Sequence, residues 1–439
     1  MILGDSKDNK LITEVEAEVC AIPIIDTHEH LISEQERRNL DLDIFFLFSH
    51  YTSTDLINSG MSEEEYFSLS DFGITEDKRW RIFEKYWQII KNTNYSKIVL
   101  ESVKALYGFD DINAANHAEI SKKINDTKNI EWYDHVLSDR SRIKYILNFI
   151  ENIPEISDTS PLKRSDTMPV KNFVDIISVC CKEDLMRFEK KYDTTLYNLK
   201  DYLDLIDSLF EESVNNNYRA IKIVLAYMRD IHFEEIDFGE ADKVFSRLYK
   251  LRDYGFLEKK DFLSKNELAP LQDHLVHYII QKAISYNLPI QIHSGLLDGN
   301  LGNISGTNPN YLINLFLKYR NAKFDIFHAG YPYSDILVSI CKQFPNVYFN
   351  LCWIHDVSAD LYGDVLERVC EILPSNKVFG FGGDYKLVEC IYGAQKTARK
   401  TITTLLYKKI RSKYFTFEEG IEYAKKILYK NPLAFYSLN

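Results

Sequence analysis

The chain has 439 residues, of which 45% are hydrophobic and 13% aromatic, and this composition is ample for a large buried core. Its formal net charge of −12, with no block rich in Lys and Arg, argues against a nucleic-acid partner or an anionic membrane surface. The polar first ten residues do not resemble a signal peptide, and no apolar run of about 18 residues predicts a membrane span. Seven scattered cysteines are typical of reduced thiols in a cytoplasmic protein.

Eight short apolar runs recur along the chain, each followed by a polar turn and a helical pattern. Strands that are apolar almost throughout and alternate with helices predict a parallel sheet buried on both faces. Eight such units predict a closed (β/α)8 TIM barrel, with an open doubly wound sheet as the alternative. The predicted strands are Ile22–Thr27, Ile143–Ile150, Phe173–Cys180, Ala220–Tyr227, Pro289–His293, Lys323–His328, Val347–Leu351 and Lys377–Gly383.

Helices are predicted between and after these strands, and the longest connection, residues 31–142, is too long for one crossover helix. Within it Trp80, Phe83, Trp87 and Ile90 recur at helical spacing, which is more typical of a core than of a cofactor site. We therefore predict a single barrel over residues 1–439 with a helical insertion at 31–142. The predicted helices include Asp77–Lys91, Lys97–Tyr107, Ala114–Ile124, 183–215, 255–287, Tyr311–Tyr319, Ser334–Gln343 and Phe417–Lys430.

Polar side chains gather where the predicted strands end. In such a barrel the carboxyl ends of the strands form the active-site face. His28 and His30 end the first strand, and residues two apart on a strand point to the same side, so both rings can share one cation. The candidates on later strands are Lys222 and Tyr227 on the fourth, His293 on the fifth, His328 on the sixth, His355 after the seventh and Asp384 after the eighth.

Each of these features alone has an ordinary structural explanation. A lone histidine after an apolar run is usually a satisfied core or surface residue, and an aspartate after two glycines is usually a turn residue. Their shared position on one face instead favours a metal site with imidazole and carboxylate ligands from His28, His30, His293 and Asp384. Such ligands suit zinc, iron, nickel or manganese. Glu29 points to the opposite side of the strand and is not counted as a ligand.

Four stretches resemble the amidohydrolase superfamily, and more narrowly its branch of aminocarboxymuconate semialdehyde decarboxylase-like enzymes and nodulin/FluG-type domains. The stretches read IDTHEH at 25–30, QIHSG at 291–295, FHAGYP at 327–332 and FGGD at 381–384. The resemblance covers residues 20–30 and roughly 218–439. It implies that His28, His30, His293 and Asp384 bind metal, that Asp384 also moves a proton, and that His328 binds a second metal or acts on the water and substrate.

Lys222 is where the sequence departs from that pattern. Two-metal relatives often bridge their ions with a carbamylated lysine on strand four, whereas Lys222 lies within the run rather than clearly at its end. One ion, Zn²⁺ before other metals, is therefore favoured over two. Lys222, Tyr227 and His355 are then substrate-binding candidates, although His355 is equally typical of a plain loop histidine.

The resemblance implies a metal-dependent hydrolase that acts on a small amide, ester or lactone through a metal-activated water. A non-oxidative decarboxylase or a uronate-type isomerase on the same barrel is the alternative, since a fold does not determine the reaction. A barrel without catalysis that only binds a ligand is less favoured. We expect a small-molecule substrate. The insertion fits either a lid or a homo-oligomer interface.

Overall fold

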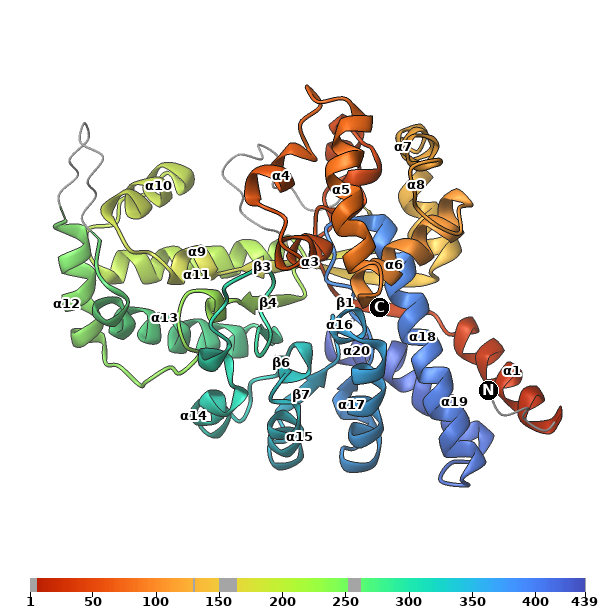
Figure 1. Ribbon diagram of the computed structural model, residues 1–439. Helices are drawn as coiled ribbons and strands as arrows, with labels where there is room; N and C mark the ends of the chain where they lie inside the picture. Colours follow the sequence, from red (N-terminus) through yellow and green to blue (C-terminus); the bar gives the residue numbers. More distant parts are fainter. Residues whose placement is uncertain (1–5, 129–130, 150–163, 252–261, 439) are drawn as a thin grey trace.

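The computed structural model describes residues 6–128, 131–149, 164–251 and 262–438 (Figure 1). Its centre is an eight-stranded parallel sheet in which the strands follow one another in chain order. They are β1 (Ile24–Glu29), β2 (Ile143–Phe149), β3 (Thr167–Asn172), β4 (Ala220–Ile223), β5 (Ile290–Ile292), β6 (Phe324–Ile326), β7 (Val347–Asn350) and β8 (Val378–Phe379).

Main-chain hydrogen bonds join the two ends of this sheet. The N–H of Thr27 donates to the carbonyl of Phe381 at 3.2 Å, and the N–H of Asp384 donates to the carbonyl of His28 at 2.9 Å. The first strand therefore meets the segment that follows the last one. The predicted (β/α)8 barrel is confirmed, and an open sheet is excluded.

The barrel wall is buried on both of its faces. Every residue of β1, β4, β5 and β6 is buried, as expected for parallel strands covered by helices. A second apolar cluster, which includes Ile25, Leu147 and Phe379, takes in Phe435 and Tyr436 from the end of the chain. The Tyr436 hydroxyl donates to Asp325 on β6, so the C-terminal segment packs into the sheet rather than against solvent.

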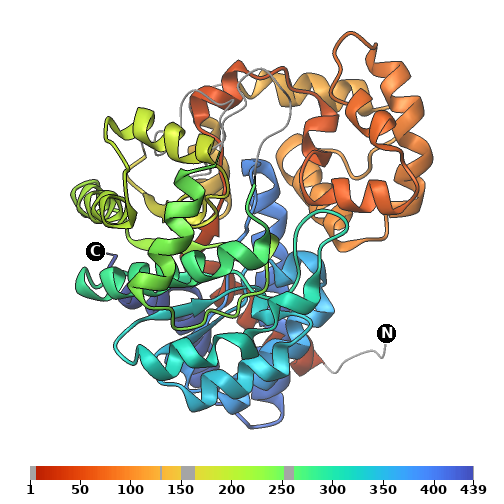
Figure 2. The ribbon, with the colours of Figure 1, turned by 90° about the vertical axis from the view of Figure 1, so that its left-hand side faces the viewer.

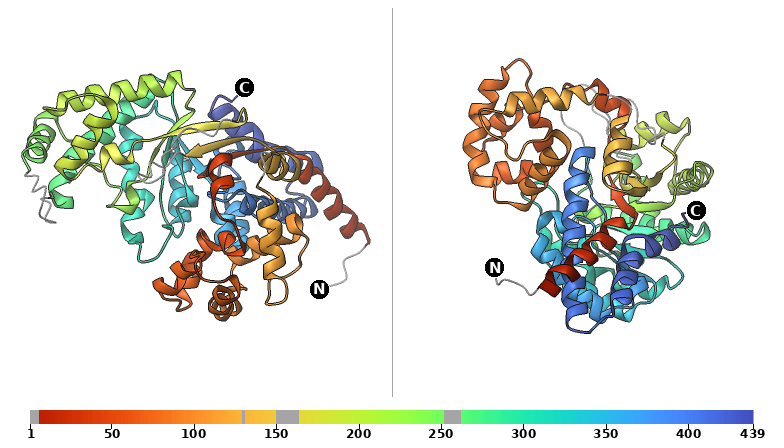
Figure 3. Two further views of the ribbon diagram at one scale, coloured as in Figure 1. Left: turned by 90° about the horizontal axis from the view of Figure 1, so that it is seen from above. Right: turned by 90° about the vertical axis from the view of Figure 1, so that its right-hand side faces the viewer.

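Helices cover the outside of the barrel. Figure 3 shows the N-terminal helix α1 (Ser6–Ala21) lying along α18 (Val388–Arg411), and the two helices are in contact. The others from β3 onward are α9 (Val174–Ile177), α10 (Lys182–Tyr192), α11 (Leu199–Asn215), α12 (Phe238–Tyr249), α13 (Lys265–Ser285), α14 (Ile313–Lys318), α15 (Ser334–Gln343), α16 (Ile354–Val357), α17 (Ala359–Ile372), α19 (Phe417–Lys425) and α20 (Asn431–Phe435). No helix in the described ranges is both long and apolar enough to cross a membrane.

The described part of the connection between β1 and β2 is mostly helical and contains no strand. Figure 2 shows most of its helices (orange) gathered in one group beside the barrel. Trp80, Phe83 and Trp87 are buried there, as their spacing predicts. The elements are α2 (Glu34–Asn39), α3 (Tyr51–Asn58), α4 (Glu63–Ser68), α5 (Glu76–Ile90), α6 (Asn94–Ser102), α7 (His117–Asp126) and α8 (Glu131–Tyr133), with the short turns η1 (Ile44–Phe48), η2 (Val103–Tyr107) and η3 (Asp134–Arg140).

The third predicted strand is wrong. The apolar run Phe173–Cys180 contains the helix α9, and β3 is the preceding segment Thr167–Asn172. Short apolar runs do not distinguish a buried strand from a buried helix turn, and Pro169 makes the true strand look unsuitable. The other strands lie within their predicted runs or differ from them by a few residues at the ends. Ile150, at the end of the second predicted run, and part of the helical segment predicted at 255–287 lie outside the described residues.

Candidate metal centre

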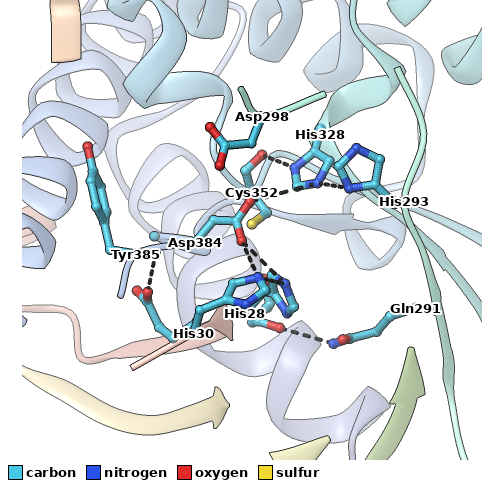
Figure 4. Close-up of polar contacts among 12 residues, drawn as sticks. His28, His30, Gln291, His293, Asp298, His328, Cys352, Asp384 and Tyr385 are labelled. Atoms are coloured by element: carbon cyan, nitrogen blue, oxygen red, sulfur yellow. Dashed lines mark hydrogen bonds and ion pairs between the residues drawn. The ribbon is translucent and has the colours of Figure 1, made fainter. Parts of the chain in front are cut away.

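Three strand ends at the mouth of the barrel turn through left-handed backbone conformations. His328 after β6, Trp353 after β7 and Asp384 after β8 have φ values of 62°, 67° and 61°. Residues other than glycine rarely adopt this region, and such positions cluster at functional sites because the surrounding fold has to hold them there. The turns place the His328 ring and the Asp384 carboxylate over the same end of the barrel (Figure 4).

Three potential ligand atoms lie within hydrogen-bonding distance of one another. The Nε2 atoms of His28 and His30 are 3.1 Å apart, and Oδ1 of Asp384 lies 3.3 Å from the first and 3.0 Å from the second. Zinc bonds of about 2.1 Å in a tetrahedral arrangement place neighbouring ligand atoms about 3.4 Å apart. Two imidazoles and a carboxylate at this spacing therefore fit one divalent cation.

His293 and His328 form a second pair of histidines. Nδ1 of His293 and Nε2 of His328 are 3.0 Å apart, and Oδ2 of Asp384 lies 3.8 Å from the His328 nitrogen. The outer nitrogen of His293 faces the carbonyl of Leu296 at 2.8 Å, and that of His328 faces the carbonyl of Cys352 at 3.2 Å. If each ring donates to its carbonyl, both inner nitrogens carry lone pairs. Asp384 thus lies between two pairs of histidines (Figure 4).

Burial makes these histidines poor bases and leaves the aspartate charged. Burial and the nearby Lys222 ammonium hold the pKa of His28 well below its usual range, and burial lowers the pKa of His328 to about 4. Burial alone would raise the pKa of Asp384, but the surrounding histidines outweigh it and keep that pKa well below its usual range. Neutral imidazoles beside an ionised carboxylate are the protonation states that metal ligands need.

Two further acidic residues of β1 hold the segment that carries Asp384. Oδ1 of Asp26 accepts the N–H of Gly383 at 3.2 Å, and Oε2 of Glu29 accepts the N–H of Tyr385 at 2.6 Å. Both carboxyls are fully buried, and burial raises the pKa of Asp26 to about 6. Glu29 thus faces away from the histidines, as strand alternation predicts, and contacts the neighbouring loop.

The cluster opens into a cavity of about 290 Å³. Its lining includes Lys222 and Tyr227 from the sequence-based candidates, together with residues that the sequence did not indicate. Tyr51 of α3 donates its hydroxyl to the backbone carbonyl of Asp384 at 2.7 Å, so the β1–β2 connection contributes directly to the mouth. The full lining is His28, His30, His50, Tyr51, Phe149, Asn172, Val174, Lys222, Val224, Tyr227, Met228, His293, Asp298, Asp384 and Lys386.

Two sequence-based candidates lie differently from expectation. His355 has no solvent exposure, packs against Tyr362 and Phe381, and is absent from the cavity lining, so this position does not contact a substrate in that cavity. His293 lines the cavity, but its nearest ring neighbour is His328 rather than the His28–His30 pair. Asp298 and Lys386 were missed because they lie on loops, where no periodic pattern marks them.

Residues 250–438 match the family model described as Amidohydrolase. Among curated proteins, the Protein fluG of Emericella nidulans is 28% identical over 179 residues, which cover 39% of this chain and 21% of that protein. The matched part thus spans about a fifth of that relative's length.

Solved structures resemble almost the whole chain. The glucuronate isomerase of Caulobacter crescentus has a TM-score of 0.78 at 16% identity over 99% of this chain and 95% of its own, and the uronate isomerase of Thermotoga maritima scores 0.75 at 15% over 99% and 100%. A protein assigned as a metal-dependent hydrolase from Lactobacillus casei scores 0.69 at 14% over 96% and 97%. At these identities the likeness concerns the fold alone.

Proposed function

We propose that the chain is a metal-dependent hydrolase of the amidohydrolase superfamily that acts on a small amide, ester or lactone. The observation that carries the proposal is the group formed by His28, His30 and Asp384, whose ligand atoms lie 3.0–3.3 Å apart at the mouth of the barrel. A site this small and partly closed suits a small molecule.

Those three residues would hold one divalent cation, and Zn²⁺ suits the mixture of two imidazoles and a carboxylate best. When bound, such an ion lowers the pKa of a water molecule and polarises a carbonyl group. His293 and His328 offer nitrogen atoms on the other side of Asp384, so His293 would either join the ligand set or contact the substrate.

Asp384 would move the proton. Its Oδ1 faces the His28–His30 pair, which leaves Oδ2 to accept a proton from the attacking water and to pass it to the leaving group. His328 lies 3.8 Å from Oδ2, and its contact with the Cys352 carbonyl fixes the ring with Nε2 toward the carboxylate. His328 would thus orient the water or receive the proton from Asp384.

A substrate panel tests this proposal. Protein loaded with zinc should hydrolyse at least one small ester, lactone or amide. Asp384→Asn should lose that activity by about a hundredfold or more, since a positioned acid–base group contributes about 10²–10⁴-fold. Zinc-loaded protein that turns over no member of a broad panel would contradict the proposal.

A uronate-type isomerase is the second candidate, and one observation favours it. The two isomerase structures resemble 99% of this chain, which includes the connection between β1 and β2 as well as the barrel. On that alternative, Asp384 and His328 would move a proton between neighbouring carbons of a hexuronate. An NMR assay that detects conversion of a hexuronate between its aldose and ketose forms separates the two reactions.

A further inference from the structure

The Lys222 ammonium is a buried cation without a hydrogen-bond partner. It lies on β4, is 1% exposed, and its Nζ finds no acceptor among the described residues. An ammonium has three N–H donors, and leaving them unsatisfied away from water is costly. Nζ lies 3.3 Å from the centroid of the Phe327 ring, and this cation–π contact compensates only in part.

No carboxylate of the described chain neutralises this cation directly. Asp384 and Asp325 act on it only through longer-range electrostatics, and Nζ has no hydrogen-bond partner among the described residues. One oxygen of Asp325 is already engaged by the Tyr436 hydroxyl and the Asn350 amide. Among the described residues, Nζ therefore has no oxygen ligand that neutralises its charge.

Lys222 lies beside the candidate metal centre. Lys222 is one of the lining residues, and the Phe327 ring that it contacts lies 4.8 Å from the His28 ring. The lining also includes the apolar side chains of Phe149, Val174, Val224 and Met228. The cavity thus combines a buried cation near its candidate ligands with an apolar surface for the body of a molecule.

We infer that Lys222 is the anion subsite of this cavity and receives the carboxylate of a small organic acid whose body is apolar. This inference deepens the proposed function. It rests on that function only because it concerns the same cavity. The substrate would then carry a carboxylate in addition to the bond that is cleaved. A volume of about 290 Å³, at the lower end for ligand pockets, restricts it to a small acid.

Binding of matched pairs of compounds tests the inference without turnover. Isothermal titration would compare benzoate with benzamide, and 3-methylbutanoate with its amide, on zinc-loaded protein and again after chelation. Each acid should bind about tenfold or more tightly than its amide, because a charge-assisted hydrogen bond is stronger than a neutral one. Glucuronate, an acid with a polar body, should bind more weakly than benzoate.

The variant Lys222→Met keeps the length of the side chain and removes the charge. It should abolish the preference for acid over amide both with and without zinc, whereas Lys386→Met, which removes a second cation of the same cavity, should leave most of it. Measuring the zinc content of every sample separates this test from the proposed function, since the preference is expected even in metal-free protein. Circular dichroism checks that each variant is folded.

Several results would overturn the inference. They are an unchanged preference in Lys222→Met, an equal loss in Lys386→Met, tighter binding of glucuronate than benzoate, or no binding of any acid by wild-type protein. Incorporation of ¹³C-bicarbonate as a carbamate on Lys222, seen by ¹³C NMR, would also overturn it, because that group would carry a negative charge. The wild-type titrations and the NMR experiment stand even where a variant does not fold.

Discussion

The carboxylate of Glu29 occupies the space where a side chain on Gly383 would begin. A Cβ atom at position 383 would overlap Oε1 of Glu29, and Oε2 of the same residue accepts the N–H of Tyr385. The acidic residue between the two histidines of β1 thus packs against the glycine that precedes Asp384. Two motifs about 350 residues apart are fitted to each other by this contact.

Removing the Glu29 carboxylate should weaken metal binding without removing a ligand. Glu29→Ala leaves the N–H of Tyr385 without its acceptor and frees the Asp384 loop. We expect zinc affinity to fall by about tenfold or more, as for other residues that hold metal ligands in place. Glu29→Gln keeps an oxygen at this position, so its zinc affinity should fall much less. Competition with a chromophoric chelator measures both, and equal affinities in wild type and Glu29→Ala would contradict the role.

The hydroxyl of Tyr51 should contribute to zinc affinity or turnover. Tyr51→Phe removes the hydrogen bond to the Asp384 carbonyl, at a cost of about 1 kcal/mol in the positioning of that loop. We expect zinc affinity or turnover to fall by roughly fivefold. Tyr95, whose ring stacks on Tyr51 at 5.2 Å, provides the control, because Tyr95→Phe keeps the stack and that hydrogen bond. Similar losses in the two variants would argue against a specific contribution of the hydroxyl.

A buried ion pair should anchor the β1–β2 connection to the barrel. Arg37 of α2 pairs with Glu389 of α18, and Glu389 also accepts from the Tyr107 hydroxyl at 3.2 Å and the Trp132 indole at 3.1 Å. Glu389→Ala leaves the Arg37 cation buried and unpaired, which should destabilise the protein by about 3–5 kcal/mol.

The double variant Arg37→Met with Glu389→Met removes both charges and should recover much of that loss. Thermal denaturation of wild type, the single variant and the double variant measures the difference. A double variant no more stable than Glu389→Ala would show that the charge itself is not the cause.

Stability should depend on pH through Asp325. Burial raises its pKa from 3.8 to about 7, while the Tyr436 and Asn350 hydrogen bonds oppose the change. Below about pH 4 both folded and unfolded chains hold the proton. As the pH rises toward 7 the unfolded chain loses its proton first, so the folded state loses stability relative to a variant that cannot ionise.

Asp325→Asn should therefore gain stability over wild type as the pH rises from 4 to 7, by up to about 4 kcal/mol. Unfolding midpoints across this range measure the difference. Asp335→Asn is the control, since that side chain is 79% exposed and should leave the pH profile unchanged. A constant difference between wild type and Asp325→Asn would contradict the raised pKa.

The sequence was most informative where apolar runs and strand ends coincide. His28, His30, His328 and Asp384 each follow or end such a run, and the barrel brings their rings and carboxylate together. Helix α5 was equally predictable, because its large apolar residues recur at the helical period over about three turns. In both cases a single repeating pattern determines the local structure.

Other features depend on contacts that no local pattern contains. Segment 167–172 is strand because β2 and β4 pair with it on either side, despite Pro169. His355 follows β7 closely, yet the turn into α16 directs its ring into the core. Tyr51 reaches the candidate metal centre only because the β1–β2 connection folds back over the mouth, which its sequence does not indicate.

Bound metal measured on purified protein tests the central claim most directly. Mass spectrometry of the metal content should find about one zinc ion per chain in wild type, and almost none after combined replacement His28→Ala and His30→Ala. The control His355→Ala, which alters a histidine outside the cavity, should retain the metal. Unchanged metal content in the double variant, or no metal in wild-type protein after incubation with zinc, would contradict the account.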